Sequence, residues 1–178
     1  MQIKNKKEIT ISPSGGTPVV VRKGNIAKWS GNQATIVTNL TASNYTQIGS
    51  SLKLTSTGRP VRIRAQVTTQ IYDGVTQQTG AVQGFVGVKR VDVPGNYMTD
   101  SYVYFTDILQ KIFNGGNIND YVGSQQPGTL DFTDPNPTVD GQVYEYYLVV
   151  NCGFFVAVTP STLKEAVTVL SFELEEVD

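Results

Sequence analysis

Residues 59–73, RPVRIRAQVTTQIYD, decide the fold class because their side chains alternate almost without interruption. One set of positions is apolar or β-branched: Val61, Ile63, Ala65, Val67, Thr69 and Ile71. The positions between them are polar: Arg62, Arg64, Gln66, Thr68 and Gln70. A period of two places successive side chains on opposite sides of an extended chain. The stretch therefore predicts a β-strand with one face buried and the other in water.

The composition of the whole chain favours an all-β protein. Its 178 residues suit one domain, and only 16% of them are charged. β-branched residues are abundant, and short apolar runs are separated by Gly, Pro and Asn, a pattern typical of a sandwich or jelly roll. No apolar run approaches the roughly 18 residues of a membrane span, and no apolar segment follows the N-terminal lysines as a signal peptide requires. We expect a chain that is assembled in a cytoplasm and has no membrane partner.

The residue types needed for most enzyme chemistry are scarce. The chain has no histidine, which excludes Ser-His-Asp triads and the common zinc sites. Its single cysteine, Cys152, cannot form a disulfide within the chain and is expected to be a small buried residue. Spare carboxylates such as Glu145 and Glu165 do not by themselves make a glycosidase pair. We expect no enzyme activity, no catalytic residues and no cofactor.

The acidic stretch DFTDPNPTVDG is the one candidate for a metal site. Asp131, Asp134 and Asp140 carry oxygen ligands of the kind that calcium prefers, but their spacing differs from that of the twelve-residue calcium loop. Asp and Asn before proline are ordinary turn residues. We therefore predict no metal ligands, although the sequence leaves calcium binding at 131–140 open.

Charge is distributed unevenly along the chain. Residues 1–72 carry a net charge of +9 and residues 73–178 a net charge of −10. Two short strands, 7–12 and 17–22, are expected to form a hairpin, with basic residues around it: Lys4, Lys6, Lys7, Arg22 and Lys23. We expect residues 1–40 to form an N-terminal arm whose basic residues anchor the chain to an acidic partner. Nucleic acid is not expected, because the basic residues are not interleaved with stacking aromatics.

The remaining residues, 41–178, are predicted to form a single sandwich domain. Strands are expected at 51–55, 81–91 and 166–177, with two more meeting near residues 151–153. Residues 92–142 read as one long insertion rich in turn formers. Within it, apolar residues at helical spacing predict a short helix over 101–113.

The segment 143–150, VYEYYLVV, is apolar on both sides. One face carries Tyr144, Tyr146, Leu148 and Val150, as a sandwich core requires. The other face carries Val143, Tyr147 and Val149, interrupted by Glu145. A strand that is apolar on both sides must be covered on both sides. The second cover comes either from a neighbouring subunit, which we favour, or from the 92–142 insertion.

The sequence also resembles a known family in an ordered set of motifs. The turn Gly58-Arg59-Pro60-Val61, the strand from Gly141 to Leu148 and the terminal Phe172-Glu173-Leu174 resemble the jelly-roll modules of the tumour-necrosis-factor and complement-head type. Versions of these modules occur widely in bacteriophage and other viral structural proteins. The resemblance covers roughly residues 50–91 and 141–177; the long 92–142 segment and the basic first 40 residues have no counterpart in the module.

The resemblance implies a ten-strand jelly roll packed as a homotrimer. We therefore expect a virion structural protein, a capsid decoration (cement) or head-fibre component that binds the major capsid protein or other virion proteins. Its subunit interface would include Val143, Tyr147 and Val149. The alternative is a carbohydrate- or receptor-binding tip domain of a phage fibre, in which Tyr- and Asn-rich segments such as 95–104 and 114–128 provide stacking and hydrogen bonds.

Overall fold

In the computed structural model the chain is all-β. The structure describes residues 2–3, 9–11, 19–21, 24–37, 45–73, 80–98, 101–114, 117–123, 125–156 and 163–178. Within them lie β1 (Gln2–Ile3), β2 (Ile9–Ile11), β3 (Val19–Val21), β4 (Ile26–Val37), β5 (Thr46–Thr55), β6 (Val61–Asp73), β7 (Gly80–Arg90), β8 (Tyr102–Asn114), β9 (Asn117–Gly123), β10 (Gln125–Thr133), β11 (Val143–Val156) and β12 (Leu163–Glu176). None of the described residues forms a helix long and apolar enough to cross a membrane.

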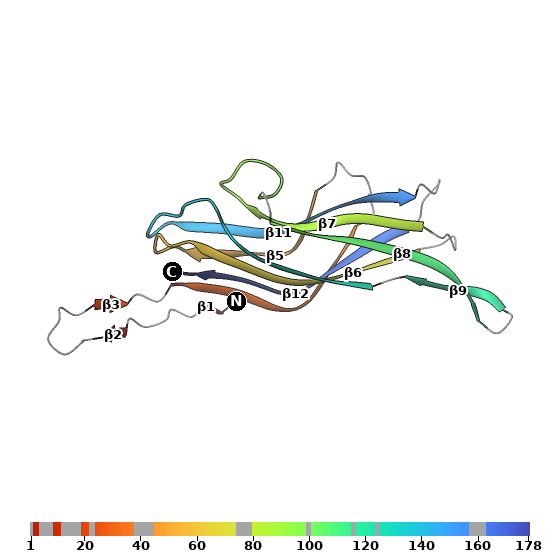
Figure 1. The fold of residues 1–178 in the computed structure, drawn as a ribbon, viewed down its shortest axis with the longest axis horizontal. Coiled ribbons are helices and arrows are strands. Elements are labelled where there is room, and N and C mark those ends of the chain that lie inside the picture. The colour runs from red at the N-terminus through yellow and green to blue at the C-terminus, as the bar shows by residue number, and fades with distance from the viewer. Residues whose placement is uncertain are drawn as a thin grey trace.

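Ten of these strands form two antiparallel sheets that pack face to face, and β2 and β3 form a separate two-stranded sheet (Figure 1). The first sheet has the order β1-β4-β12-β6-β10, and the second sheet has the order β5-β11-β7-β8-β9. Apart from the short β1 and the added β9, pairing is nested: β4 pairs with β12, β5 with β11, β6 with β10 and β7 with β8. This nesting, distributed over two sheets, is the jelly-roll arrangement. The predicted jelly-roll sandwich is confirmed.

The opening stretch forms β6 and has the predicted two faces. Its inward residues are at most 2% exposed: Val61, Ile63, Ala65, Val67, Thr69 and Ile71. Between them, Arg62, Gln66 and Gln70 are exposed. β6 lies between β12 and β10, so its backbone is paired on both sides and its inner face meets the second sheet.

β11 has the predicted core face but is longer than expected. Tyr144, Tyr146, Leu148 and Val150 are all buried on its inner side. Residues 143–156 form one continuous strand, so the predicted break near 151–153 is wrong. The irregularity lies elsewhere, because the register with β5 shifts between Tyr146 and Leu148. Gly49, on the β5 side of this shift, has a φ of 67°, a conformation that glycine adopts without strain.

The predicted helix over 101–113 is wrong, because these residues form β8. β8 pairs with β7 in a continuous ladder from Tyr102 opposite Gly87 to Leu109 opposite Gly80. Phe105 and Asp107 are buried, whereas Tyr104, Thr106 and Ile108 are exposed, which is a period of two. The segment is rich in β-branched and aromatic residues, which favour a strand. Pairing with the edge of β7 outweighed the partly helical spacing of its apolar residues. Residues 92–142 are therefore no insertion, since they supply β8, β9 and β10.

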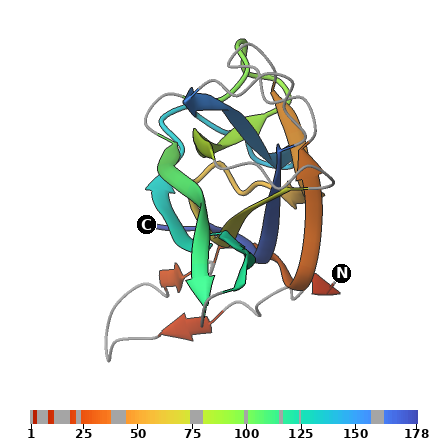
Figure 2. The same ribbon diagram turned by 90° about the vertical axis from the view of Figure 1, so that its right-hand side faces the viewer.

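The predicted boundary of the N-terminal arm at residue 40 is also wrong. β4 belongs to the first sheet and pairs with β12 from Ile26 to Val37. Its inward residues Ala27 and Val37 are 2% and 5% exposed, so the sandwich core includes them. Residues 28–32 lie inside this strand as well. The predicted hairpin is present as β2 paired with β3. It projects beyond one end of the sandwich (Figure 1), and the view along the long axis shows it below the two sheets (Figure 2).

A buried ion pair closes the end of the sandwich nearest the start of β11. The side chain of Arg90 at the end of β7 is 5% exposed and that of Asp134 is fully buried, with Nη1 and Oδ2 2.9 Å apart. Tyr146 donates its hydroxyl hydrogen bond to the same oxygen of Asp134 at 2.9 Å, and Asn136 donates to the other. The Arg90 guanidinium also binds both oxygens of Asp92 and stacks 4.5 Å from the centre of the Tyr144 ring. Every charge in the cluster therefore has partners.

Replacing Asp134 by alanine should strongly destabilise the fold. The change leaves the Arg90 guanidinium and the Tyr146 hydroxyl buried with fewer partners, which costs roughly 3–5 kcal/mol in comparable buried pairs. Asp131→Ala is the matched control, because it removes the partner of the exposed Arg62 and should change stability far less. Urea denaturation of both variants measures the difference. Equal losses of unfolding free energy in the two variants would show that the buried pair does not stabilise this end.

Candidate functional site

Five aromatic rings gather on the outer side of the second sheet. They come from four parts of the chain: Tyr45 before β5, Phe85 on β7, Tyr97 in the β7–β8 connection, and Tyr102 and Tyr104 on β8. We call these five residues the aromatic face. The period of two along β8 places its two tyrosines outward while Phe105 points inward and is buried. The strand pairing then sets Phe85 directly opposite Tyr104.

Phe85 is the centre of the aromatic face. Its ring centroid lies 4.8 Å from that of Tyr97 and 5.6 Å from that of Tyr102, both in tilted geometry. Tyr45 and Tyr104 meet it edge-on at 6.2 and 6.1 Å. Such tilted and edge-to-face arrangements are favourable for aromatic pairs. The rings therefore hold one another in a fixed arrangement.

A glycine allows the rings to approach the sheet. Gly87 lies opposite Tyr102, and a Cβ atom placed on it would be 3.5 Å from the Cβ of Tyr97 and 3.6 Å from that of Tyr102. Any longer side chain at this position would occupy the space between the two tyrosines. Glycine at position 87 of β7 thus leaves the space in which Tyr97 and Tyr102 pack.

The aromatic face is only partly covered by the chain itself. Tyr104 is 67% exposed and Tyr45 is 37% exposed. Large exposed aromatic side chains add nothing to the core of the chain that carries them. Tyrosine combines a large apolar surface with a hydroxyl group, and it is enriched where proteins contact partners. The aromatic face is therefore the described surface best suited to binding.

The predicted interface residues on β11 lie on the same side of the second sheet. Val143 is 57% exposed, Tyr147 is half-buried, and Val149 is only 3% exposed. Val149 is opposite Gly87, beside which Tyr97 packs, so the chain itself covers this position. The sequence left two possible covers for this side of β11, a neighbouring subunit or residues 92–142. At Val149 the cover is internal, whereas Val143 remains accessible.

The sequence predicted the aromatic face only in part. The Tyr-rich segment 95–104 was identified, but the helix predicted over 101–113 does not place Tyr102 and Tyr104 on one outward face, as a strand does. The predicted anchoring residues, Lys4, Lys6, Lys7, Arg22 and Lys23, lie outside the described residues.

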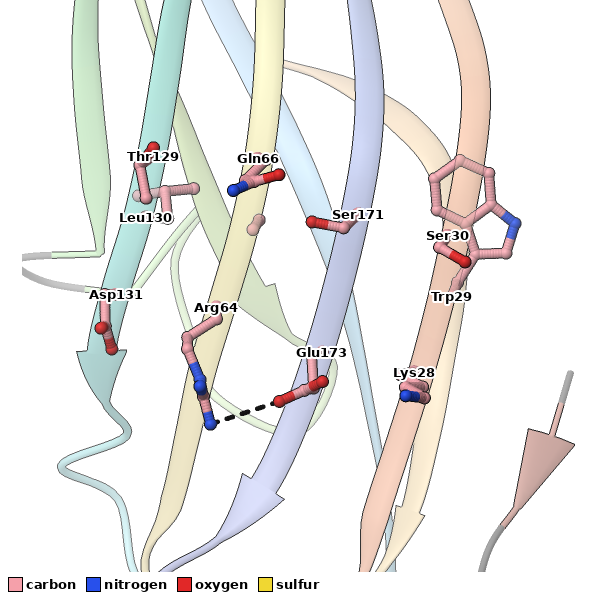
Figure 3. A pocket seen from close by; sticks show the side chains of 11 residues that line it. Lys28, Trp29, Ser30, Arg64, Gln66, Thr129, Leu130, Asp131, Ser171 and Glu173 are labelled. Atoms are coloured by element: carbon pink, nitrogen blue, oxygen red, sulfur yellow. Dashed lines mark ion pairs between the residues drawn. The ribbon is translucent and has the colours of Figure 1, made fainter.

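The outer side of the first sheet carries a different surface, made of charged and polar side chains. One cross-strand row runs from Lys28 on β4 to Glu173 on β12, Arg64 on β6 and Asp131 on β10. Arg64 pairs with Glu173 at 3.3 Å and also with Glu175. Beside the row, a shallow hollow of about 320 Å³ is lined by Trp29, Gln66 and Ser171 among others (Figure 3).

The acidic residues of 131–140 are engaged in contacts within the protein. Asp131 accepts two hydrogen bonds from Arg62, at 2.8 and 2.7 Å, and these hold the pKa of its carboxyl below the usual value. Asp134 belongs to the buried Arg90 cluster, and Asp140 is exposed. Within the described ranges, no three His, Cys, Asp or Glu side chains are grouped so that they could hold a metal ion.

Two carboxyl groups are buried in the core between the sheets. Glu165 on β12 and Asp107 on β8 are both 0% exposed. Burial, together with hydrogen bonding and charge repulsion from the neighbouring Asp107, raises the pKa of Glu165 to about 10. Burial, together with Glu165, also raises the pKa of Cys152 to about 12. Such a thiol is protonated at neutral pH and a poor nucleophile. Since both carboxyl groups are sealed from solvent, a substrate has no access to them.

Comparison of the chain with protein-family models and with curated proteins found no match.

Glu165 should make stability fall as pH rises. With a folded pKa near 10 and an ordinary unfolded value near 4.5, the folded chain holds a proton that the unfolded chain has lost between these pH values. The unfolding free energy then decreases by up to about 1.4 kcal/mol per pH unit. Glu165→Gln removes this dependence, so its melting temperature should exceed that of the parent most at pH 9 and least at pH 5.

The control for this experiment is Glu145→Gln. Glu145 is half-buried on the outer side of β11, and Ser51 holds its pKa below the ordinary value. This variant should keep the downward slope of the parent chain between pH 5 and pH 9. Parallel melting curves for the parent chain and Glu165→Gln would mean that Glu165 ionises normally inside the fold.

Proposed function

We propose that this chain is a non-enzymatic structural protein of a virus particle, a trimeric jelly roll that decorates the capsid or forms part of a head fibre. The aromatic face holds copies of the chain together, and the N-terminal arm attaches the assembly to the major capsid protein. The observation that carries the proposal is the exposed, ordered aromatic face on a sandwich whose own core is already complete.

Self-association through the aromatic face follows from its chemistry. Tyr104 and Tyr45 expose large apolar surfaces, and Val143 exposes a further one on the same side of the sheet. Burying this surface against another copy removes it from water at about 25 cal/mol per Å² of apolar area. The rings are already fixed by Phe85, so little side-chain freedom is lost on binding. The threefold order of the assembly is taken from the resemblance of the strand motifs to trimeric jelly-roll modules.

The arm supports attachment to a particle. The β2–β3 hairpin extends beyond the body, and the basic residues of the first 23 positions lie next to its strands in the sequence. An extended basic element can contact an acidic capsid surface without changing the sandwich. Such contacts speed encounter and weaken with salt.

A second candidate function is a carbohydrate- or receptor-binding tip domain of a fibre. It is favoured by one observation, the grouping of Tyr97, Tyr102 and Tyr104 in an accessible cluster. A glycan array distinguishes the two functions. Binding of a defined glycan that is lost in Tyr104→Ala supports recognition, whereas stoichiometric binding to undecorated capsids supports decoration.

Tyr104→Asp should break the assembly. The change places a charge in an apolar contact, and the dissociation constant should rise on the order of tenfold or more. The side chain points out of the sandwich and is 67% exposed, so the subunit should keep its fold. Light scattering coupled to size exclusion should find a trimer for the parent chain and a smaller species for the variant.

The control is Ile36→Asp, which changes a 55% exposed residue on β4 of the first sheet and should leave the trimer intact. A parent chain that elutes as a monomer at micromolar concentration would refute the proposed assembly.

Deleting residues 1–12 should abolish binding to particles while leaving the body folded. The deletion removes β1, β2 and three of the basic residues, but none of the strands that form the core cluster. Co-sedimentation with particles measures binding, and circular dichroism checks the fold. Substituting Lys4, Lys6 and Lys7 by glutamine in the intact arm tests whether charge is the cause. Undiminished co-sedimentation of the deleted chain would place the anchor elsewhere.

A further inference from the structure

One edge of the second sheet is open along the first half of β8. β7 pairs with β8 from Tyr102 to Leu109, whereas β9, on the other side of β8, pairs only from Leu109 to Asn114. The chain then leaves this edge, because the next strand, β10, pairs with β6 of the first sheet. Among the described strands, none pairs with residues 102–108 on the side away from β7.

The register determines which backbone groups of β8 face the open edge. The N–H of Val88 donates to the C=O of Ser101 at 3.0 Å. Hydrogen-bonded and non-hydrogen-bonded positions alternate along an antiparallel ladder, so the odd-numbered residues of β8 bond to β7. The even-numbered residues therefore direct their backbone groups away from β7. Tyr104 and Thr106 together present two N–H and two C=O groups to the open edge.

The pairing on the far side of β7 agrees with this assignment. The N–H of Val91 donates to the C=O of Glu145 at 3.0 Å. The odd-numbered residues of β7 thus bond to β11, which leaves its even-numbered residues for the odd-numbered residues of β8. Both neighbours of β7 give the same orientation for the backbone of β8.

The other sheet edges carry features that hinder pairing with a further strand. β5, at the opposite edge of the second sheet, has the register shift beside Gly49, and the Gln33 side chain accepts the N–H of Ser50 at 3.0 Å. β10, an edge of the first sheet, contains Pro127. Bulges, prolines and charges are the usual means of protecting an edge. Residues 102–108 of β8 contain no proline, their ladder with β7 has no shift, and their one charged side chain is buried.

The charge pattern of this edge suits a second copy of the same edge. The outward side chains are uncharged: Tyr102, Tyr104, Thr106 and Ile108. Tyr104 and Ile108 are 67% and 42% exposed. When two copies of one strand pair about a two-fold axis, a charged side chain near the axis lies close to its own copy and is repelled. The outward face of this edge has no such charge.

We propose that the open edge of β8 pairs with the same edge of a second copy of the chain about a two-fold axis. With the axis at Phe105, Tyr104 lies opposite Thr106 of the second copy, and the two residues exchange N–H···O=C hydrogen bonds. All four open backbone groups of each copy are then used. Ile108 lies opposite Tyr102 of the second copy, an aromatic and aliphatic pair of the kind that stabilises sheets. The two aromatic faces become continuous across the joint.

This contact differs from the one that holds the proposed trimer together. It lies at the edge of the sheet and uses backbone groups, whereas the trimer buries the outward faces of the rings. Two-fold contacts between threefold assemblies link them into a layer, which is how the pairing would act on a particle if the proposed function holds. Because few hydrogen bonds form, we expect the pairing at submillimolar rather than micromolar concentration of the chain.

Thr106→Pro tests the pairing. Proline lacks the N–H that Thr106 directs to the open edge, and it leaves the bonds between β8 and β7 in place. In sedimentation velocity from micromolar to submillimolar concentration, the full-length parent chain should form species larger than its micromolar assembly. Thr106→Pro should lose these species, whereas Thr106→Ala, which keeps the N–H, should form them as the parent chain does.

Hydrogen exchange of the parent chain tests the same contact without a substitution. The amides of Tyr104 and Thr106 should exchange quickly at micromolar concentration and slowly at submillimolar concentration. The amide of Phe105, which bonds to β7, is the internal control and should exchange slowly at both.

The results separate this pairing from the proposed trimer. A parent chain that does not grow with concentration, equal growth of Thr106→Pro and the parent chain, or unchanged exchange at Tyr104 and Thr106 overturns the edge pairing. A micromolar species that is a monomer refutes the trimer instead. In that case, growth to a dimer that Thr106→Pro does not form still supports the edge pairing.

Discussion

Packing of the inner faces of β6 and β12 against those of β7 and β11 holds the molecule together. Ile63 and Leu174 on one sheet and Val86 and Tyr146 on the other are each 0% exposed. Burial of these side chains is the main favourable term in folding. Because each strand alternates, this contact also determines which residues point outward. The side chains on both outer surfaces are therefore a consequence of the same packing.

Charged and ionisable groups inside the sandwich divide it into two unlike ends. Near the start of β11, Arg90 and Asp134 are buried with partners for every charge. Further along β11, Cys152 lies near Glu165, and Glu165 and Asp107 are two acids in one apolar space. The first end is stabilised by pairing, whereas the stability of the second end decreases when Glu165 loses its proton.

The two outer faces differ in kind. The second sheet presents tyrosines around Phe85, and the first sheet presents paired charges and hydroxyls. Apolar aromatic surface gains free energy when it is buried against another surface, whereas paired charges and hydroxyls remain stable in contact with water.

Local patterns in the sequence determined those strands in which apolar and polar side chains alternate without interruption. β6 and the inner face of β11 were predicted correctly, as was the N-terminal hairpin, because a period of two is a property of neighbouring residues. Tertiary structure alone decided that residues 101–113 extend along β7, and that β4 joins the first sheet through β12. It also brought Tyr45, Phe85 and Tyr104 together, and paired Arg90 with Asp134 across 44 positions of sequence. These contacts join segments far apart in the chain, and they form only when both sheets close over one core, which no local pattern encodes.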